Sequence, residues 1–430
     1  MKIGLFLILI FQSLNLFASS FQLVDEDLGN ILVTLLEQPK SKNEVASRED
    51  CEFDNSGNNL TKLYLCKIYL QEIYVTDDID TYVAYIKQLL LYKISPVKIS
   101  EYSKVLSAEY DEVNSKLYYR VAESMYRHGD YDHAIEYLKK IDDTLDDESV
   151  YKALLIYGLI YFEKNNYKKS KYFLKRIEKS SGVYKYAQYN LALINMKSSW
   201  WAEAEENLVN AINSIDVLTV SKTDEELLDK MYLTLGYSKI NRKNFRDAKS
   251  SFEKISINSA LQSRGLLGVA MSEIGMGNLS KAAPILKHII KNSSNDEYLD
   301  ALVTLPQVYH HANNIKLTVD YYQSALERLR EYQRDVDKES NKYDYHKINS
   351  LWDRNNINKR ITVIEQLKNQ FVLTMKQRDH IDNIEKQLKS EISKYLKSIN
   401  QQTSKKIDEY IKQVKYSMAV IYDEAVASND

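Results

Sequence analysis

The sequence contains few of the residues that interrupt helices. It has 11 glycines and 4 prolines among 430 residues, and no glycine follows Gly277. Stretches that alternate apolar and polar residues, the pattern of a half-buried strand, are nearly absent, whereas Lys, Glu, Leu and Ile are abundant. This composition argues against a fold built on sheets or glycine-rich loops. It predicts an almost wholly helical, all-α protein.

Neither sign of charge dominates the chain. Its 58 basic and 60 acidic residues leave a formal net charge of −2. A nucleic-acid binder normally carries a clear basic excess, so we expect no nucleic-acid partner. One region, 386–415, has eight lysines against Glu391, Asp408 and Glu409. We expect a solvated helix face there, with a contact to acidic partners or lipid headgroups as the alternative.

Motifs for catalysis or metal binding are also missing. The sequence has no glycine-rich phosphate loop, no Gly-x-Ser-x-Gly elbow, no paired-cysteine zinc motif and no His-Glu-x-x-His. The adjacent pair His310 and His311 would point about 100° apart on a helix and cannot converge on one metal ion. We therefore predict no catalytic residue, no metal site, no cofactor and no enzymatic activity.

Residues 1–20 have the organisation of a secretory signal peptide. Lys2 gives the positive start, "IGLFLILIF" and "LNLF" form the apolar core, and Ala18, Ser19 and Ser20 are small residues suited to cleavage. We expect removal after Ala18 or Ser20 and export, which in a two-membrane bacterium means the periplasm. An uncleaved N-terminal anchor is the alternative. No other stretch approaches the length of a membrane span, so the mature chain should have none.

The sequence has two cysteines, Cys51 and Cys66. Export would place them in an oxidising compartment, where an even number favours a disulfide. Such a bridge would close a short loop and stabilise the fold by roughly 3 kcal/mol. The alternative is a buried free Cys66 and an unrelated, exposed Cys51.

A repeat runs through the middle of the chain. A small residue is followed four residues later by a large apolar one, and the steps between successive small residues are 36, 34, 44, 34 and 36. Another compact residue precedes each small one by twelve positions. The small residues are Ala134, Ser170, Ala204, Ala248, Ala282 and Thr318, and their large partners are Leu138, Leu174, Leu208, Phe252, Leu286 and Tyr322. A period of this length predicts a solenoid of stacked helical hairpins.

The repeat resembles the tetratricopeptide repeat (TPR). The stretch from Tyr118 to Ile141, "YYRVAESMYRHGDYDHAIEYLKKI", is similar to a consensus copy, and six units in one frame cover residues 115–332. The resemblance implies a right-handed helical solenoid. It also implies recognition of a protein or peptide in a concave groove, without chemistry of its own.

The resemblance also places particular residues of each first helix on the concave side. These partner-binding candidates are Leu155, Leu159, Phe162, Tyr189, Leu193, Met196, Leu233, Tyr237, Ile240, Leu267, Met271 and Ile274. Because nearly all are apolar, something should cover them. The cover is either the chain's own C-terminal segment or an amphipathic or extended segment of a partner. A shift of one residue in the alignment would instead make these residues ordinary core.

The segments flanking the repeats are expected to be helical too. Residues 21–114 show helices without the repeat frame and suit an atypical N-terminal cap. In residues 333–430, apolar side chains from Ile357 to Ile421 recur at steps of mostly three and four, as in a coiled-coil-like seam. We expect a folded-back hairpin that breaks near Gln377-Arg378-Asp379 or at "NQQTSKK" (400–406). One long helix, or oligomerisation through this stripe, is the alternative.

Together these features predict an exported, non-enzymatic scaffold that binds or organises proteins of the cell envelope. Binding of polysaccharide or peptidoglycan strands through exposed tyrosine and tryptophan is the main alternative, with Trp200 and Trp201 as the best candidates. A cell-wall lytic enzyme is a weaker one. It would need a catalytic glutamate in a domain with glycine-rich turns, which the sequence after Gly277 does not offer.

Overall fold

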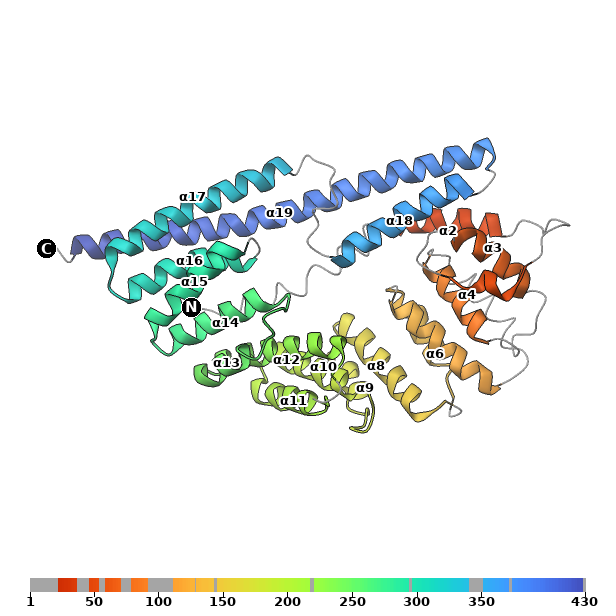
Figure 1. The fold of residues 1–430 in the computed structure, drawn as a ribbon, viewed down its shortest axis with the longest axis horizontal. Helices are drawn as coiled ribbons and strands as arrows, with labels where there is room; N and C mark the ends of the chain where they lie inside the picture. The colour runs from red at the N-terminus through yellow and green to blue at the C-terminus, as the bar shows by residue number, and fades with distance from the viewer. Residues whose placement is uncertain are drawn as a thin grey trace. The chain divides into compact units, whose positions relative to one another are not determined.

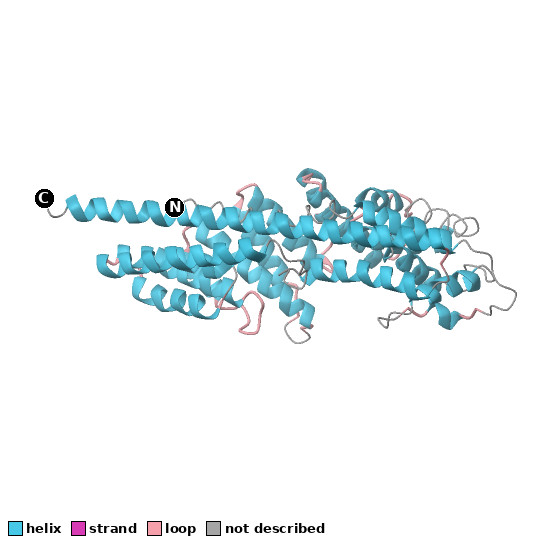
Figure 2. Ribbon diagram, turned by 90° about the horizontal axis from the view of Figure 1, so that it is seen from above, coloured by secondary structure: helices cyan, strands magenta, loops and turns pink. Residues whose placement is uncertain are grey.

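The structure is a computed structural model that describes residues 22–36, 46–53, 59–70, 79–91, 111–127, 129–142, 145–216, 220–293, 296–339, 351–370 and 373–427. In these ranges every regular element is a helix, as Figure 2 shows. The predicted signal peptide lies outside the described residues.

Six helical hairpins follow one another in the middle of the chain (Figure 1). Their helices are α6 (Asp111–Arg127) and α7 (Tyr131–Leu138), α8 (Asp147–Glu163) and α9 (Tyr167–Leu174), α10 (Tyr184–Lys197) and α11 (Trp201–Asn213), α12 (Lys222–Asn241) and α13 (Phe245–Phe252), α14 (Gln262–Gly275) and α15 (Leu279–Asn292), and α16 (Asp296–His311) and α17 (Ile315–Glu339). The 44-residue step corresponds to a longer α11 and to an α12 that begins early, at a Ser221 cap.

The same tight turn joins the two helices of every hairpin. The residue five positions before each small residue has a positive φ, between 55° and 81°; these residues are Gly129, Asn165, Ser199, Lys243, Gly277 and Asn313. At Ser199, for example, the next amide, of Trp200, bonds to the carbonyl of Asn195, which closes the end of the first helix. Glycine or asparagine, which tolerate this conformation, occupies four of these sites, whereas Ser199 and Lys243 are residues that rarely adopt it.

The repeat prediction is confirmed by burial. All six small residues of the second helices have no exposed surface, and their six large partners are at most 3% exposed. The compact residues of the first helices, from Ala122 to Pro306, are buried as well. Side chains without bulk at these two places let paired helices approach closely, and the large side chains fill the space between successive pairs. The all-α, TPR-type solenoid predicted from the sequence is therefore the observed fold.

The chain divides into two compact units, which do not follow the order of the sequence. The first contains residues 1–165 and 343–396, and the second contains 166–342 and 397–430. The division falls between the two helices of the second repeat and again inside the last helix, α19 (Met375–Ala427).

The regular elements described in the N-terminal part of the first unit are all helices. They are α2 (Gln22–Leu36), the short 3-10 helix η2 (Arg48–Cys51), α3 (Asn59–Leu70) and α4 (Ile79–Leu91). A disulfide between Cys51 and Cys66 joins η2 to α3, and both cysteines are buried. Lys67 of α3 donates to the carbonyl of Leu36 at the end of α2, where a helix leaves carbonyls without partners.

The first unit also contains a C-terminal hairpin. It is made of α18 (Leu351–Gln370) and residues 375–396 of α19, which lie side by side in Figure 1. Lys368 bonds to both Asp382 and Glu385 across this hairpin. Thr374 and Gln377 bond reciprocally at the start of α19, which places the break just before one of the two predicted sites. The break predicted at 400–406 is wrong, because α19 continues through it.

In the second unit, residues 397–427 of α19 close the last repeat. Ile407, Ile411, Val414 and Ile421 are buried in one cluster with apolar residues of α16 and α17. At the other end of the stripe, within the first unit, Ile381, Ile384, Leu388 and Ile392 are buried too. The apolar stripe of α19 thus packs within the chain itself. Its buried residues leave little apolar surface for contact with a second copy of the protein.

A close contact at Phe252 provides a test of the packing. A Cβ atom added to Gly236 of α12 or to Gly268 of α14 would lie 2.5 Å from the Phe252 ring, which is buried. We expect Gly236→Ala to lower the free energy of unfolding by about 1–3 kcal/mol through overpacking, despite the higher helix propensity of alanine. Urea unfolding measures the change. In a Phe252→Leu background, Gly236→Ala should lower the free energy of unfolding much less, because the ring is gone. If the effects of the two substitutions simply add, this explanation is wrong.

Candidate partner-binding face

Nine of the predicted groove residues line the first helices of three consecutive repeats in the second unit. They are Tyr189, Leu193 and Met196 of α10, Leu233, Tyr237 and Ile240 of α12, and Leu267, Met271 and Ile274 of α14. In each repeat they lie 15, 11 and 8 residues before the small residue of the second helix. We call this set the first-helix face. Leu155, Leu159 and Phe162 hold the same places on α8, in the first unit.

The structure buries this face to different degrees. Met196, Leu233, Tyr237, Ile240 and Leu267 are buried, whereas Tyr189, Leu193, Met271 and Ile274 are half-buried. On α8, Phe162 is buried and Leu155 and Leu159 are half-buried. None of the twelve is exposed.

Packing between repeats explains the buried members. Leu267 belongs to one cluster with Leu286 of α15 and Leu305 of α16. The ring of Tyr237 meets that of Phe252 edge-on, with 5.1 Å between the ring centres. Met271 and Ile274 pack against the Leu267 cluster and, like Tyr189 and Leu193, keep part of their surface exposed.

The C-terminal stripe was one expected cover for this face. In the second unit its buried residues cluster with α16 and α17, and none of the nine residues of the first-helix face belongs to that cluster. The described core contacts therefore assign α19 to the end of the array, where a terminal helix shields the last repeat.

A polar cluster adjoins the first-helix face, and the sequence analysis did not identify it. Arg264 of α14 bonds to Glu297 of α16 at 2.6 Å, and Tyr410 of α19 donates to Asp300 of α16. Lys406, also on α19, pairs with Asp296 at 3.0 Å. The signal in the sequence was a charged residue 18 positions before the small residue, where Arg264 and Asp300 both lie. These contacts attach α19 to the last repeat.

Two polar atoms of this cluster are buried without a hydrogen-bond partner among the described residues. They are the hydroxyl of Tyr237 and the Oδ2 atom of Asp300. Burial raises the pKa of Asp300 to about 6, against a smaller opposing effect of the Tyr410 hydrogen bond, and burial also raises the pKa of Tyr237. Burial thus makes ionisation of this carboxyl less favourable than it is for a carboxyl in water.

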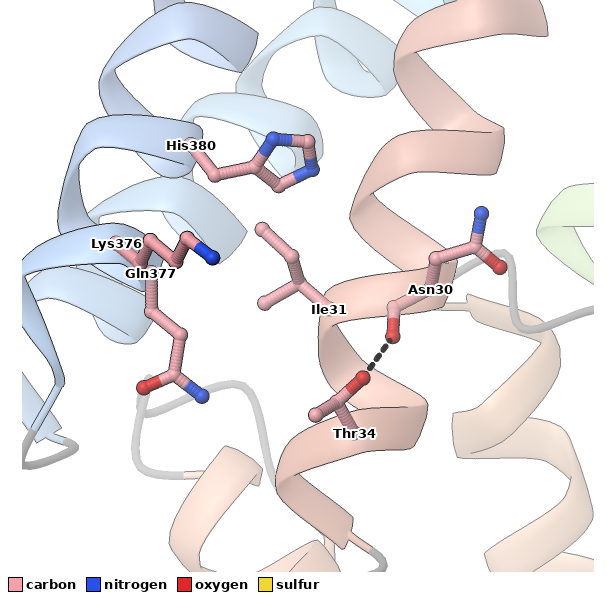
Figure 3. Close-up of a pocket in the computed structure, with 6 residues that line it drawn as sticks. All are labelled: Asn30, Ile31, Thr34, Lys376, Gln377 and His380. Atoms are coloured by element: carbon pink, nitrogen blue, oxygen red, sulfur yellow. Dashed lines mark hydrogen bonds between the residues drawn. The ribbon is translucent and has the colours of Figure 1, made fainter.

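The first unit has an open pocket of about 410 Å³ between α2 and the start of α19 (Figure 3). Asn30, Ile31 and Thr34 line one side and Lys376, Gln377 and His380 the other. Thr34 donates to the carbonyl of Asn30 in its own helix, so that hydroxyl is already used. Asn30, Lys376 and His380 are exposed, so this open cleft offers no buried polar group among its lining residues to fix a ligand.

The two adjacent tryptophans play different roles. Trp201 is half-buried at a packing position of the repeat, and Trp200 is 54% exposed in the preceding turn. The Lys171 Nζ atom lies 4.1 Å from the centre of a Trp200 ring. A cation therefore occupies one ring face that a sugar would need for stacking.

Within the described ranges, no three His, Cys, Asp or Glu side chains are grouped as metal ligands would be. The described part after Gly277 consists of α15 to α19 and their short connections, and no separate lysozyme-like domain is found in it. In those same ranges no helix combines the length and apolarity needed to cross a bilayer.

The Asp300 carboxyl gives a pH test of the α19 attachment. Because its folded pKa of about 6 exceeds the ordinary 3.8, the folded state binds the proton more tightly. The proton bound to Asp300 stabilises the folded state by up to about 3 kcal/mol. This stabilisation is fully present below about pH 4 and is lost as pH rises through 6. We therefore expect Asp300→Asn to be more stable than the wild type at pH 7.5, with the advantage vanishing towards pH 4.5. Thermal melts across this pH range measure the difference in melting temperature between the two proteins. A difference that does not change with pH would contradict the raised pKa of Asp300.

Comparison with known proteins finds matches among solved structures. No protein-family model and no curated protein sequence matches it. Among solved structures, the C-terminal part of a TPR repeat-containing protein from Cytophaga hutchinsonii is 15% identical, with 57% of this chain and 93% of that chain covered and a TM-score of 0.45. The apo form of RapI is 13% identical, with 82% and 100% covered and a TM-score of 0.46.

The TPR domain of P58(IPK) is 12% identical to this chain, with 76% of this chain and 93% of that chain covered and a TM-score of 0.21. The fold is instead established by the six hairpins themselves, with their shared turn and their fully buried small residues. By that geometry, the chain is a tetratricopeptide-type helical solenoid.

Proposed function

We propose that this chain is an exported, non-enzymatic scaffold that binds or organises other proteins of the cell envelope through the first-helix face. The observation that carries the proposal is the repetition of apolar side chains at three fixed places of successive first helices, four of them only half-buried. A row of this kind suits an amphipathic helix or an extended apolar segment, which could cover several repeats at once.

The neighbouring polar cluster supports a role in orientation. An apolar face gives affinity without direction, whereas a few convergent polar groups fix the register of a bound segment. Arg264 is 30% exposed in its side chain and keeps donors beyond the one bonded to Glu297. Arg264 lies seven residues before Met271 on α14, about two helical turns away, and would set one end of a docked segment.

Export is proposed from the sequence of residues 1–20 and from the cysteine pair. A disulfide persists in an oxidising compartment and is rare in a reducing one. The bond between Cys51 and Cys66 is buried, so it would serve the stability of the first unit. A periplasmic scaffold is the proposal that accounts for both features.

Substitution of the half-buried residues tests the binding face. Leu193→Glu and Met271→Glu each add a charge that a docked apolar segment would have to bury without a partner, so binding should weaken at least about tenfold. The readout is mass spectrometry of envelope proteins cross-linked to each variant. Val209→Glu is the matched control, because Val209 is an apolar residue of α11 that is 44% exposed. Equal capture by all three folded variants would exclude the face, and unfolding of the first two would assign those residues to the core.

Export can be tested in cells of a two-membrane bacterium. We expect a periplasmic product that starts after Ala18 or Ser20, by mass spectrometry, and that carries no free thiol. The double variant Cys51→Ser and Cys66→Ser should lose roughly 3 kcal/mol of stability under non-reducing conditions. The wild type with added reductant should match the variant. A full-length product in the cytoplasm with both thiols free would contradict the proposal.

A further inference from the structure

A second surface of the molecule, on α9, has a strong local charge. Residues 166–179 contain six lysines and arginines against one acidic residue, Glu178, although the whole chain has a net charge of −2. The sequence analysis did not single out this segment, because its helix fits the repeat frame. In the second unit it forms α9 and the turns that follow.

The repeat frame determines how this charge is presented. Ser170 and Leu174 face the core and have no exposed surface. Lys168, Lys171 and Lys175 are spaced by three and four residues, so they lie together on another side of the helix. Lys168 and Lys175 are exposed, as are Arg176 and Lys179 beyond them, and Lys171 is half-buried.

Two exposed aromatic rings lie among these cations. Tyr172 is 60% exposed and Trp200 is 54% exposed. Lys171 Nζ lies 4.1 Å from a Trp200 ring centre, and the Arg176 guanidinium lies 5.6 Å from that of Tyr172. The rings hold the long cationic side chains in place, which lowers the entropy cost of using them in binding.

The positive charge of this surface is not balanced within the unit. Lys185, Arg242, Lys249 and Arg264 of the same unit all pair with carboxylates. Among the described residues, Lys168, Lys175, Arg176 and Lys179 form no such ion pair. Burial and then the charge of Lys175 lower the pKa of Lys171, although Glu203 opposes the shift. The cations thus repel one another and would gain from an added negative charge.

The borders of the surface limit what can bind. Lys168 and Lys175 are seven residues apart, or about 10 Å along a helix. Glu203 and Glu206 are exposed on α11, and Glu203 is near enough to act on Lys171. A long polyphosphate chain or an anionic membrane would extend over these acidic residues and be repelled, whereas a short carboxylate segment would not.

We propose that the α9 surface, formed by Lys168, Lys171, Tyr172, Lys175, Arg176 and Trp200, docks a short acidic segment of a partner protein. Carboxylates of the segment pair with the lysines and the arginine. An apolar side chain of the same segment packs on the outer face of Trp200. This surface lies on a second helix and is separate from the first-helix face, so it does not depend on the function proposed for that face.

Binding of a synthetic peptide to the full mature chain tests the proposal. The probe is a fluorescein-labelled peptide rich in glutamate with interspersed leucine, and fluorescence anisotropy gives its affinity. The variant Lys168→Glu with Lys175→Glu should bind at least about tenfold more weakly, and added salt should weaken binding by the wild type. The control, Lys222→Glu with Lys412→Glu, makes the same charge change at exposed sites on α12 and α19 and should bind as the wild type does.

The variant Trp200→Ala distinguishes binding that depends on this aromatic ring from nonspecific electrostatic attraction of the peptide. It leaves the net charge unchanged and should weaken peptide binding several-fold. No peptide binding at low salt, equal losses in the control pair, or full binding by Trp200→Ala would overturn the proposal. Tighter binding of heparin, or of vesicles containing an anionic lipid, would assign the surface to another class of ligand and overturn it as well.

Discussion

The close approach of two helices at a small residue is the constraint on which the rest of this structure depends. Ala134 and its equivalents, which include Ser170 and Thr318, have no exposed surface, and a bulky side chain in their place would overpack the contact between the paired helices. A hairpin of this kind cannot bury its own apolar side chains fully. It therefore needs the next hairpin, and the chain stacks. Phe252, between Gly236 and Gly268, shows how little space remains between successive pairs.

The ends of such a stack expose apolar surface, and the chain closes one of them itself. The apolar stripe of α19 covers the last repeat, where Ile407 and Ile411 join α16 and α17 in one cluster. Asp300 and Tyr410 add a buried hydrogen bond to this contact at some electrostatic cost, since the carboxyl lies in a place that favours its neutral form. The attachment of α19 is thus stabilised chiefly by apolar burial and oriented by polar contacts.

The surfaces left for partners follow from the same frame. First helices present apolar rows and, at their edge, Arg264. The second helix α9 presents cations, because its inner positions are fixed by packing and its outer positions are free to vary in composition. Two chemically different surfaces on one array suit a protein that holds more than one segment at a time. Neither surface requires a reacting group, in keeping with the absence of catalytic motifs from the sequence.

The sequence by itself determined the repeat, its helical hairpins and the burial of Ala248 and its equivalents, because spacing along a helix decides which side chains share a face. It also indicated the pair Cys51 and Cys66. Only the tertiary structure decided that Tyr237 packs against Phe252, that α19 begins after Thr374 and continues through 400–406, and that Asp300 meets Tyr410. These contacts join residues far apart in the chain, and local periodicity carries no information about which distant faces will meet.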